Sequence, residues 1–194
     1  MDKISYALGI SLGENLLANG LKNLNYSDLA RALEDVLERR PLEIDVREAQ
    51  QILNKYLVEL QQRAAEEAKT EGRAFLAENA KRAEVKTLPS GLQYEIIREG
   101  SGKKPKASDR VQVHYHGTLI DGTVFDSSVQ RGELATFGVT QVISGWVEAL
   151  QLMTEGAKWK LFIPSDLAYG SQGAGAHIKP HSTLIFEVEL LKIV

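Results

Sequence analysis

The feature that most constrains this chain of 194 residues is a change of pattern at Leu88-Pro89-Ser90-Gly91. Before this turn-forming segment, apolar residues recur three and four positions apart, as in helices, and Pro41 is the only proline. After it, apolar and polar residues alternate in short runs, which is typical of β-strands. The chain therefore divides into an N-terminal helical part and a C-terminal part built mainly from sheet.

The N-terminal pattern predicts three helices. Residues 5–19 carry an apolar side, and a second helix is expected to begin at an N-cap, Ser27. Asp45-x-x-Glu48 resembles a capping box and opens a third helix, whose apolar stripe continues to Leu60. The side of the first helix holds Tyr6, Ile10, Leu16 and Leu17.

Residues 61–86 lose the stripe and contain charges of both signs interrupted by alanine. A helix that is polar on all sides is typical of a strut through solvent, and some 38 helical residues would span roughly 57 Å. Gly72 within it is either a bending point or a merely tolerated glycine. We therefore predict a helical dimerisation domain at 1–60, a long charged linker helix at 61–86 and a third domain at 87–194.

Self-association is expected because residues 1–60 offer too little apolar surface to fold alone. The alternative is a monomer with a poorly ordered helical hairpin. In the C-terminal part, strands are expected at 92–98, 111–120, 158–163 and 183–194, with a tight turn at Asp121-Gly122. A lone short helix at 146–153 supplies the apolar cover that such a sheet needs. The fold class is α+β: an all-α domain with a long linker helix, then an antiparallel sheet wrapped around one short helix.

Composition excludes several classes of function. The chain has no cysteine, which removes disulfides and thiol nucleophiles, and its formal charge of −3 supplies no basic patch for nucleic acid. No apolar run has the length of a membrane span. The start of the chain lacks the pattern of a secretory signal, so a cytoplasmic protein is expected as written. A periplasmic or cell-surface location applies if a signal peptide has been removed.

Motifs of hydrolases and phosphate binders do not occur. No Gly-x-Ser-x-Gly is present, and the glycine-rich stretch 170–175 lacks the lysine and helix of a phosphate loop. We interpret this stretch as a flexible loop over a pocket. His114 and His116 would lie on one face of a strand and are a conceivable metal pair, but strand histidines without a metal are commoner. No metal site and no cofactor are predicted.

Aromatic and aliphatic residues are spread through the C-terminal part. Their simplest interpretation is the core of a β-domain, while the polar atoms of tryptophan and tyrosine favour a pocket. The set contains Tyr115, Phe125, Phe137, Val142, Ile143, Trp146, Tyr169, Ile178 and Phe186.

Five ordered motifs then resemble one family, the FKBP-type peptidyl-prolyl cis/trans isomerases. They are Val113-His-Tyr-His-Gly-Thr-Leu119, Asp121-Gly-Thr-Val-Phe-Asp-Ser-Ser128, Val142-Ile-Ser-Gly-Trp-Val-Glu-Ala-Leu150, Leu167-Ala-Tyr-Gly170 and Thr183-Leu-Ile-Phe-Glu-Val-Glu-Leu190. The N-terminal half is similar, more loosely, to the macrophage infectivity potentiator branch, which places a helical dimerisation domain and a long helix before the isomerase domain.

The resemblance implies a role for each motif residue. Trp146 forms the floor beneath a bound proline ring, and the Tyr169 hydroxyl and the Ile143 amide donate to substrate carbonyls. Asp126 lies at the rim, Phe137 lies behind the pocket, and Ile178 belongs to the final loop. The walls are Tyr115, Phe125, Val142, Ile143 and Phe186.

The sequence departs from small family members at four positions. Ala135 and Ala174 replace larger residues, which predicts a more open wall, and His177 and Lys179 are unusual in the final loop. The implied partners are proline-containing unfolded or partly folded polypeptides and macrolide inhibitors, with a homodimer through the N-terminal helices. The alternative function is a dimeric chaperone or binding module whose isomerase activity is incidental.

Overall fold

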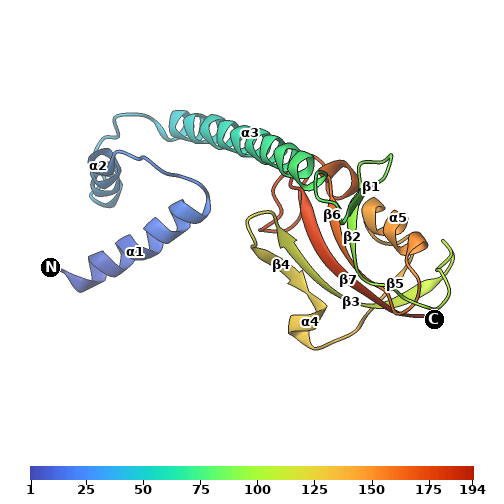
Figure 1. The fold of residues 1–194 in the computed structure, drawn as a ribbon. Helices are drawn as coiled ribbons and strands as arrows, with labels where there is room; N and C mark the ends of the chain where they lie inside the picture. Colours follow the sequence, from blue (N-terminus) through green and yellow to red (C-terminus); the bar gives the residue numbers. More distant parts are fainter. The chain divides into compact units, whose positions relative to one another are not determined.

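The computed structural model describes residues 1–194 and contains two compact units, Met1–Gln61 and Gln62–Val194. The first unit contains α1 (Lys3–Ala18), α2 (Tyr26–Leu37) and the first part of α3 (Val46–Asn79) (Figure 1). The three expected helices are confirmed. The N-cap of α2 is Asn25 rather than Ser27, because the Asn25 carboxamide oxygen accepts the backbone N–H groups of Ser27 and Asp28.

No residue of the first unit is buried. Tyr6 remains 60% exposed and Val36 61% exposed, although both belong to the apolar sides of their helices. The apolar stripes of this unit therefore do not close a core within a single chain. None of the helices of the protein is both long and apolar enough to cross a membrane.

The second unit is built on a seven-stranded antiparallel sheet whose order is β1-β2-β6-β7-β3-β4, with β5 pairing the other part of β3. The four expected strands are confirmed, and three short strands were not predicted. The strands are β1 (Val85–Thr87), β2 (Gln93–Arg98), β3 (Arg110–Leu119), β4 (Val124–Ser127), β5 (Ala135–Gly138), β6 (Lys158–Ile163) and β7 (Leu184–Ile193).

The expected short helix is α5 (Ser144–Leu152), but it is not the lone one. A one-turn helix, α4 (Ser128–Arg131), follows β4, and a 3-10 turn, η1 (Ser165–Leu167), follows β6. The α+β fold class is confirmed, with α5 as the helix around which the sheet wraps.

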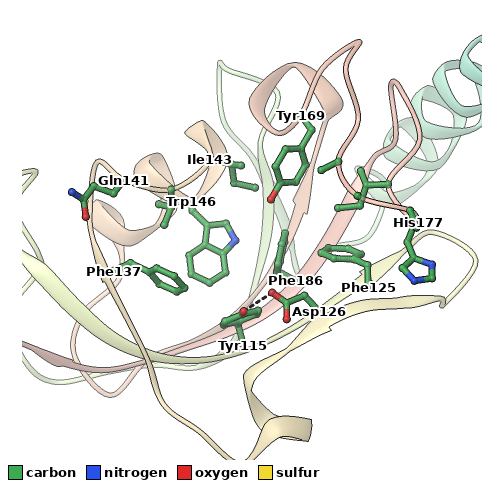
Figure 2. A pocket seen from close by; sticks show the side chains of 15 residues that line it. Tyr115, Phe125, Asp126, Phe137, Gln141, Ile143, Trp146, Tyr169, His177 and Phe186 are labelled. Atoms are coloured by element: carbon green, nitrogen blue, oxygen red, sulfur yellow. Dashed lines mark hydrogen bonds between the residues drawn. The ribbon is translucent and has the colours of Figure 1, made fainter.

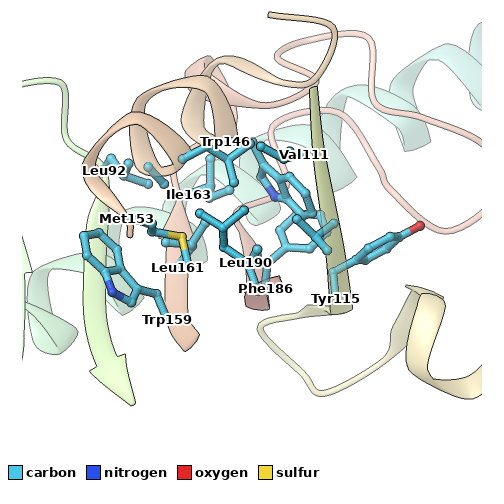
Figure 3. Packing of buried hydrophobic residues seen from close by; sticks show 14 of the residues in the cluster. Leu92, Val111, Tyr115, Trp146, Met153, Trp159, Leu161, Ile163, Phe186 and Leu190 are labelled. Atoms are coloured by element: carbon cyan, nitrogen blue, oxygen red, sulfur yellow. The ribbon is translucent and has the colours of Figure 1, made fainter. Parts of the chain in front are cut away.

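The main core lies between α5 and one face of the sheet (Figure 3). Trp146 and Leu150 of α5 are buried in one cluster with Leu161 and Val188. The helix comes close to the sheet because Gly145 has no side chain: a Cβ atom there would lie 2.6 Å from the Ile163 side chain. This close packing fixes where α5, and with it Trp146, stands relative to the strands.

The last turns of α3 pack on the opposite face of the sheet. The rings of Phe75 and Phe162 lie 6.0 Å apart, and the Asn79 carboxamide donates to Gln93 at 2.8 Å. A Cβ atom on Gly72 would lie 2.3 Å from Thr183 Oγ1, so Gly72 is a close-contact glycine rather than a bending point. The expectation of a strut through solvent is therefore wrong for these turns, and α3 has 34 residues, about 51 Å.

Candidate active site

A cavity of about 650 Å³ opens beside α5, and Figure 2 shows its fifteen lining side chains. All ten residues singled out from the sequence line it: Tyr115, Phe125, Asp126, Phe137, Val142, Ile143, Trp146, Tyr169, Ile178 and Phe186. Phe137, expected behind the pocket, is part of the lining itself. The remaining lining residues are Gln141, Ala174, Gly175, Ala176 and His177.

Trp146 stands among three aromatic rings that meet it edge to face. The ring centroids of Tyr115, Phe137 and Phe186 lie 5.5, 5.9 and 5.2 Å from that of Trp146, at interplanar angles of 82°, 89° and 82°. Such T-shaped contacts are favourable for aromatic quadrupoles and hold each ring in one orientation. The cavity therefore has a rigid apolar base.

The buried indole Nε1 of Trp146 has no hydrogen-bond partner in the protein. Figure 2 shows the nitrogen side of the indole turned toward Phe186, the ring that stands nearly perpendicular to it. The base of the cavity thus holds a buried donor that no group of the protein accepts.

Gly117 of β3 makes room for one wall. A Cβ atom at this position would come within 2.8 Å of the rings of both Phe125 and Phe186. These two rings meet across it with centroids 5.3 Å apart at 85°. Any larger residue at Gly117 would push the wall into the cavity.

A polar network holds the rim at Tyr115. The Tyr115 hydroxyl donates to Asp126 Oδ2 at 2.5 Å and accepts from Arg131 at 2.9 Å. Arg131 also forms an ion pair with the other oxygen of Asp126, and its guanidinium lies 5.7 Å from the Tyr115 ring centroid. The carboxylate is therefore occupied with positioning a wall residue.

These contacts change the acidity of the three groups. Burial raises the pKa of Tyr115, and its hydrogen bond to Asp126 raises it further. Partial burial acts to raise the pKa of Asp126, but hydrogen bonds from Tyr115 and Arg131 outweigh it and leave that pKa below its ordinary value. Hydrogen bonds to Asp126 and Tyr115 raise the pKa of Arg131. Asp126 therefore stays ionised at neutral pH and is unsuited to donate a proton.

Ser127 and Ser128, which follow Asp126, attach the end of β4 and the start of α4 to β3. Ser128 Oγ accepts the Tyr115 backbone N–H at 2.8 Å, and Ser127 Oγ caps α4 by accepting the Gln130 N–H at 3.2 Å. The Nδ1 atoms of His114 and His116 lie 3.1 and 3.0 Å from the hydroxyls of Ser128 and Ser127. The histidines thus hydrogen-bond a structural segment, and no group of three metal-ligating side chains is assembled in the protein.

Two donors on residues that line the cavity have no partner in the protein. Tyr169 is 39% exposed, and its hydroxyl points into the cavity in Figure 2. Ile143 lies just before α5, where its carbonyl accepts the N–H groups of Trp146 and Val147 while its own N–H makes no hydrogen bond. Both groups are available to a ligand.

The glycine-rich loop lies over the cavity, as expected, but it is more ordered than a free loop. Ala174 and Ile178 exchange two backbone hydrogen bonds of 2.8 and 3.1 Å, which close a narrow turn. A Cβ atom on Gly173, at φ 64°, would lie 2.3 Å from the Ile178 carbonyl oxygen. Ala174 and His177 line the cavity, whereas Lys179 does not.

Ala135 is not itself among the lining residues, and the more open wall expected from its short side chain stays a prediction. Ala135 pairs with Val113 on β5, where its short side chain packs against the core. Sequence reasoning missed Gln141 and Arg131. Arg131 follows Asp126 by five residues, and only the one-turn α4 brings the two side chains together.

Comparison with known proteins agrees with the geometry. Residues 101–191 match the model of the family described as FKBP-type peptidyl-prolyl cis-trans isomerase, and residues 1–96 match the domain amino terminal to it. The FKBP-type 22 kDa peptidyl-prolyl cis-trans isomerase of Escherichia coli is 48% identical over 197 residues, covering 98% of this chain and 94% of the relative. The outer membrane protein MIP of Legionella longbeachae is 44% identical, covering 99% and 85%.

Among solved structures, FkpA from Escherichia coli superposes with a TM-score of 0.76 at 37% identity, covering 98% of this chain and 95% of that one. Both family models and full-length relatives thus account for the two halves of the sequence. The chain belongs to the family of FKBP-type peptidyl-prolyl cis-trans isomerases.

Proposed function

We propose that the aromatic cavity binds the proline ring of an X–Pro segment and accelerates rotation about its peptide bond. The family assignment makes the chain a peptidyl-prolyl cis/trans isomerase. The observation that carries the site assignment is the apolar base. There, three aromatic rings each stand nearly perpendicular to the Trp146 ring. Among the amino acids, proline is the one whose preceding peptide bond readily populates both the cis and the trans isomer.

The reaction breaks no covalent bond, so the site needs no nucleophile and no proton donor. Rotation faces a barrier of about 18–20 kcal/mol because amide resonance is lost in the twisted state. An apolar cavity removes water from the amide carbonyl, and water stabilises the planar, charge-separated resonance form. A site complementary to the twisted amide therefore lowers the barrier.

In this mechanism the lining residues have separate roles. Trp146 supports the proline ring, and the Tyr169 hydroxyl and the Ile143 N–H hold carbonyls of the flanking chain. Asp126 and Arg131 act through Tyr115, whose ring they hold in place. Val142, Ile178 and the phenylalanines exclude water.

Replacing Trp146, the floor of the cavity, tests whether this cavity is the isomerase site. Trp146→Leu should reduce kcat/KM sharply in a protease-coupled assay with a proline peptide. The matched control is Trp159→Leu, which also removes a buried tryptophan with an unpartnered Nε1 but lies outside the cavity. Equal activity of the two folded variants would contradict the role of Trp146.

The role of the Tyr169 hydroxyl can be tested without changing the buried core. Tyr169→Phe removes only one exposed donor, so we expect a loss of about threefold to tenfold in kcat/KM. Tyr94→Phe, which removes a hydroxyl outside the cavity, is the control. An unchanged rate in Tyr169→Phe would remove this residue from the mechanism.

We further propose that residues 1–60 form the contact of a homodimer and that residues 87–194 carry the isomerase site. Residues 61–86 then link these two domains. The support is the first unit, which buries no residue in a single chain and exposes apolar side chains along α1 and α2. A paired arrangement with two cavities also suits a holding role for partly folded chains, because linked sites raise effective concentration. A variant that is monomeric yet still isomerises peptides should then lose protection of a refolding protein against aggregation.

The expected ligands are proline-containing unfolded or partly folded polypeptides and macrolide inhibitors that fill the same cavity. A macrolide should compete with a proline peptide for the wild-type chain. We also propose a cytoplasmic location for the protein. Fractionation of cells that express the natural gene tests this location.

A further inference from the structure

A second cavity, of about 310 Å³, adjoins the first within the Gln62–Val194 unit. It lies between the second half of α3, the turn between β3 and β4, and the loop that precedes β7. Ala176 and His177 line both cavities, so the two adjoin at this loop. We call the second cavity the α3 groove; its other lining residues are Ala64, Glu67, Ala68, Glu71, Leu119, Ile120, Asp121, Thr123, Lys179, Ser182 and Thr183.

The α3 groove carries an excess of negative charge. Its acids are Glu67, Glu71 and Asp121, and its bases are Lys179 and His177. Asp121 is already engaged: hydrogen bonds from Thr123, with a smaller contribution from the Lys179 charge, lower its pKa. Charge on the loop side of the groove is therefore largely balanced.

The α3 side is not balanced. Glu67 and Glu71 lie one helical turn apart and form no ion pair, although the neighbouring Glu66 pairs with Lys69. Like charges four residues apart repel and destabilise a helix. A cation placed between Glu67 and Glu71 would relieve this repulsion.

The groove also has an apolar strip and a buried hydroxyl. Ala64 and Ala68 lie on the same stretch of α3 and suit the methylene stem of a long side chain. Thr183 is only 5% exposed, and its hydroxyl lies against Gly72 of α3 and makes no hydrogen bond within the protein. This combination fits a polypeptide that carries a basic residue.

Building on the isomerase function, we propose that the α3 groove extends the substrate site. It takes the extended segment flanking the proline and favours a Lys or Arg side chain held between Glu67 and Glu71. Because the two cavities share Ala176 and His177, a chain whose proline fills the first cavity continues close to the second, which identifies the flanking chain as the occupant. An extended chain advances about 3.3 Å per residue, so a few residues suffice to reach the groove.

The test uses the full chain and two peptide series with a single proline. One series carries Lys, and the other carries Glu, at successive positions on either side of the proline. Cis/trans exchange is followed by NMR, which needs no coupling protease. We expect kcat/KM to be about threefold or more higher for Lys than for Glu at one or two positions, and the difference to fall at high salt.

The double variant Glu67→Gln/Glu71→Gln should reduce this Lys-to-Glu ratio toward one. The control is Glu66→Gln, which removes one negative charge from the same helix outside the groove and should keep the wild-type ratio. A ratio of one at every position in the wild type, or a double variant that keeps the wild-type ratio, would overturn the proposal. Wild-type activity toward a short neutral peptide tests the isomerase function separately, so the two failures are distinguishable.

Discussion

Asp126 illustrates how a charged residue serves an apolar site without taking part in the chemistry. Its carboxylate binds the Tyr115 hydroxyl and Arg131, and both contacts lie at the rim of the cavity. Because Arg131 comes from α4, the two serines that fasten α4 to β3 also hold this network. The Asp-Ser-Ser segment is therefore one positioning unit for the Tyr115 ring.

Replacing this carboxylate should weaken catalysis without abolishing it. Asp126→Asn removes a charge-assisted hydrogen bond and leaves Arg131 unpaired, so Tyr115 loses its fixed orientation. We expect kcat/KM to fall several-fold in the NMR exchange assay. Glu133→Gln, an exposed acid outside the cavity, is the control, and an equal effect in both variants would contradict the positioning role.

The same residue predicts a pH dependence of stability. Folding lowers the pKa of Asp126 below its ordinary value of 3.8, so the ionised group stabilises the fold above that value. This contribution is lost as the pH falls through the lowered pKa. The difference in free energy of unfolding between the wild type and Asp126→Asn should shrink from about pH 7 to about pH 2 in denaturant titrations. A difference that stays constant over this range would contradict the assignment.

At the scale of elements, α3 is held to the sheet by a contact that requires glycine. Adding a methyl group at Gly72 places it against Thr183 Oγ1, so Gly72→Ala should destabilise the protein by about 1–3 kcal/mol although alanine is the better helix former. Thr183→Ala removes the obstructing hydroxyl, and the double variant should recover much of the loss. Denaturant unfolding of the four proteins gives the coupling energy, and strictly additive effects would refute the contact.

The elements also show what the sequence can predict. Alternation identified β2, β3, β6 and β7, which have six to ten residues each. It missed β1, β4 and β5, because three or four residues carry too short a pattern and these strands depend on their neighbours. The charged pattern of α3 likewise gave no sign of the close contact at Gly72. Its partner, Thr183, is more than a hundred residues away in the sequence.

For the site, motifs located all ten expected lining residues because the family resemblance fixes their order and spacing. They did not locate Arg131, whose role depends on the path of the chain through α4. The α3 groove was equally hidden, since it exists only where α3 meets the β3–β4 turn.

At the scale of the whole molecule, exposed apolar residues of the first unit predict the oligomeric state. Ile10 is 51% exposed on the apolar side of α1, so Ile10→Glu should disrupt a homodimer. Ser11→Glu adds the same charge at the neighbouring position and should leave it intact. Light scattering of the full chain measures the mass, and a monomeric wild type would contradict the proposed dimer.

The central claim is that the Trp146 cavity catalyses prolyl isomerisation. The most direct measurement is the cis/trans exchange rate of a short proline peptide, followed by NMR with substoichiometric amounts of the full-length protein. We predict exchange far faster than the uncatalysed process, which takes tens to hundreds of seconds, and loss of the acceleration in folded Trp146→Leu. An exchange rate that the wild-type protein leaves unchanged would contradict the claim.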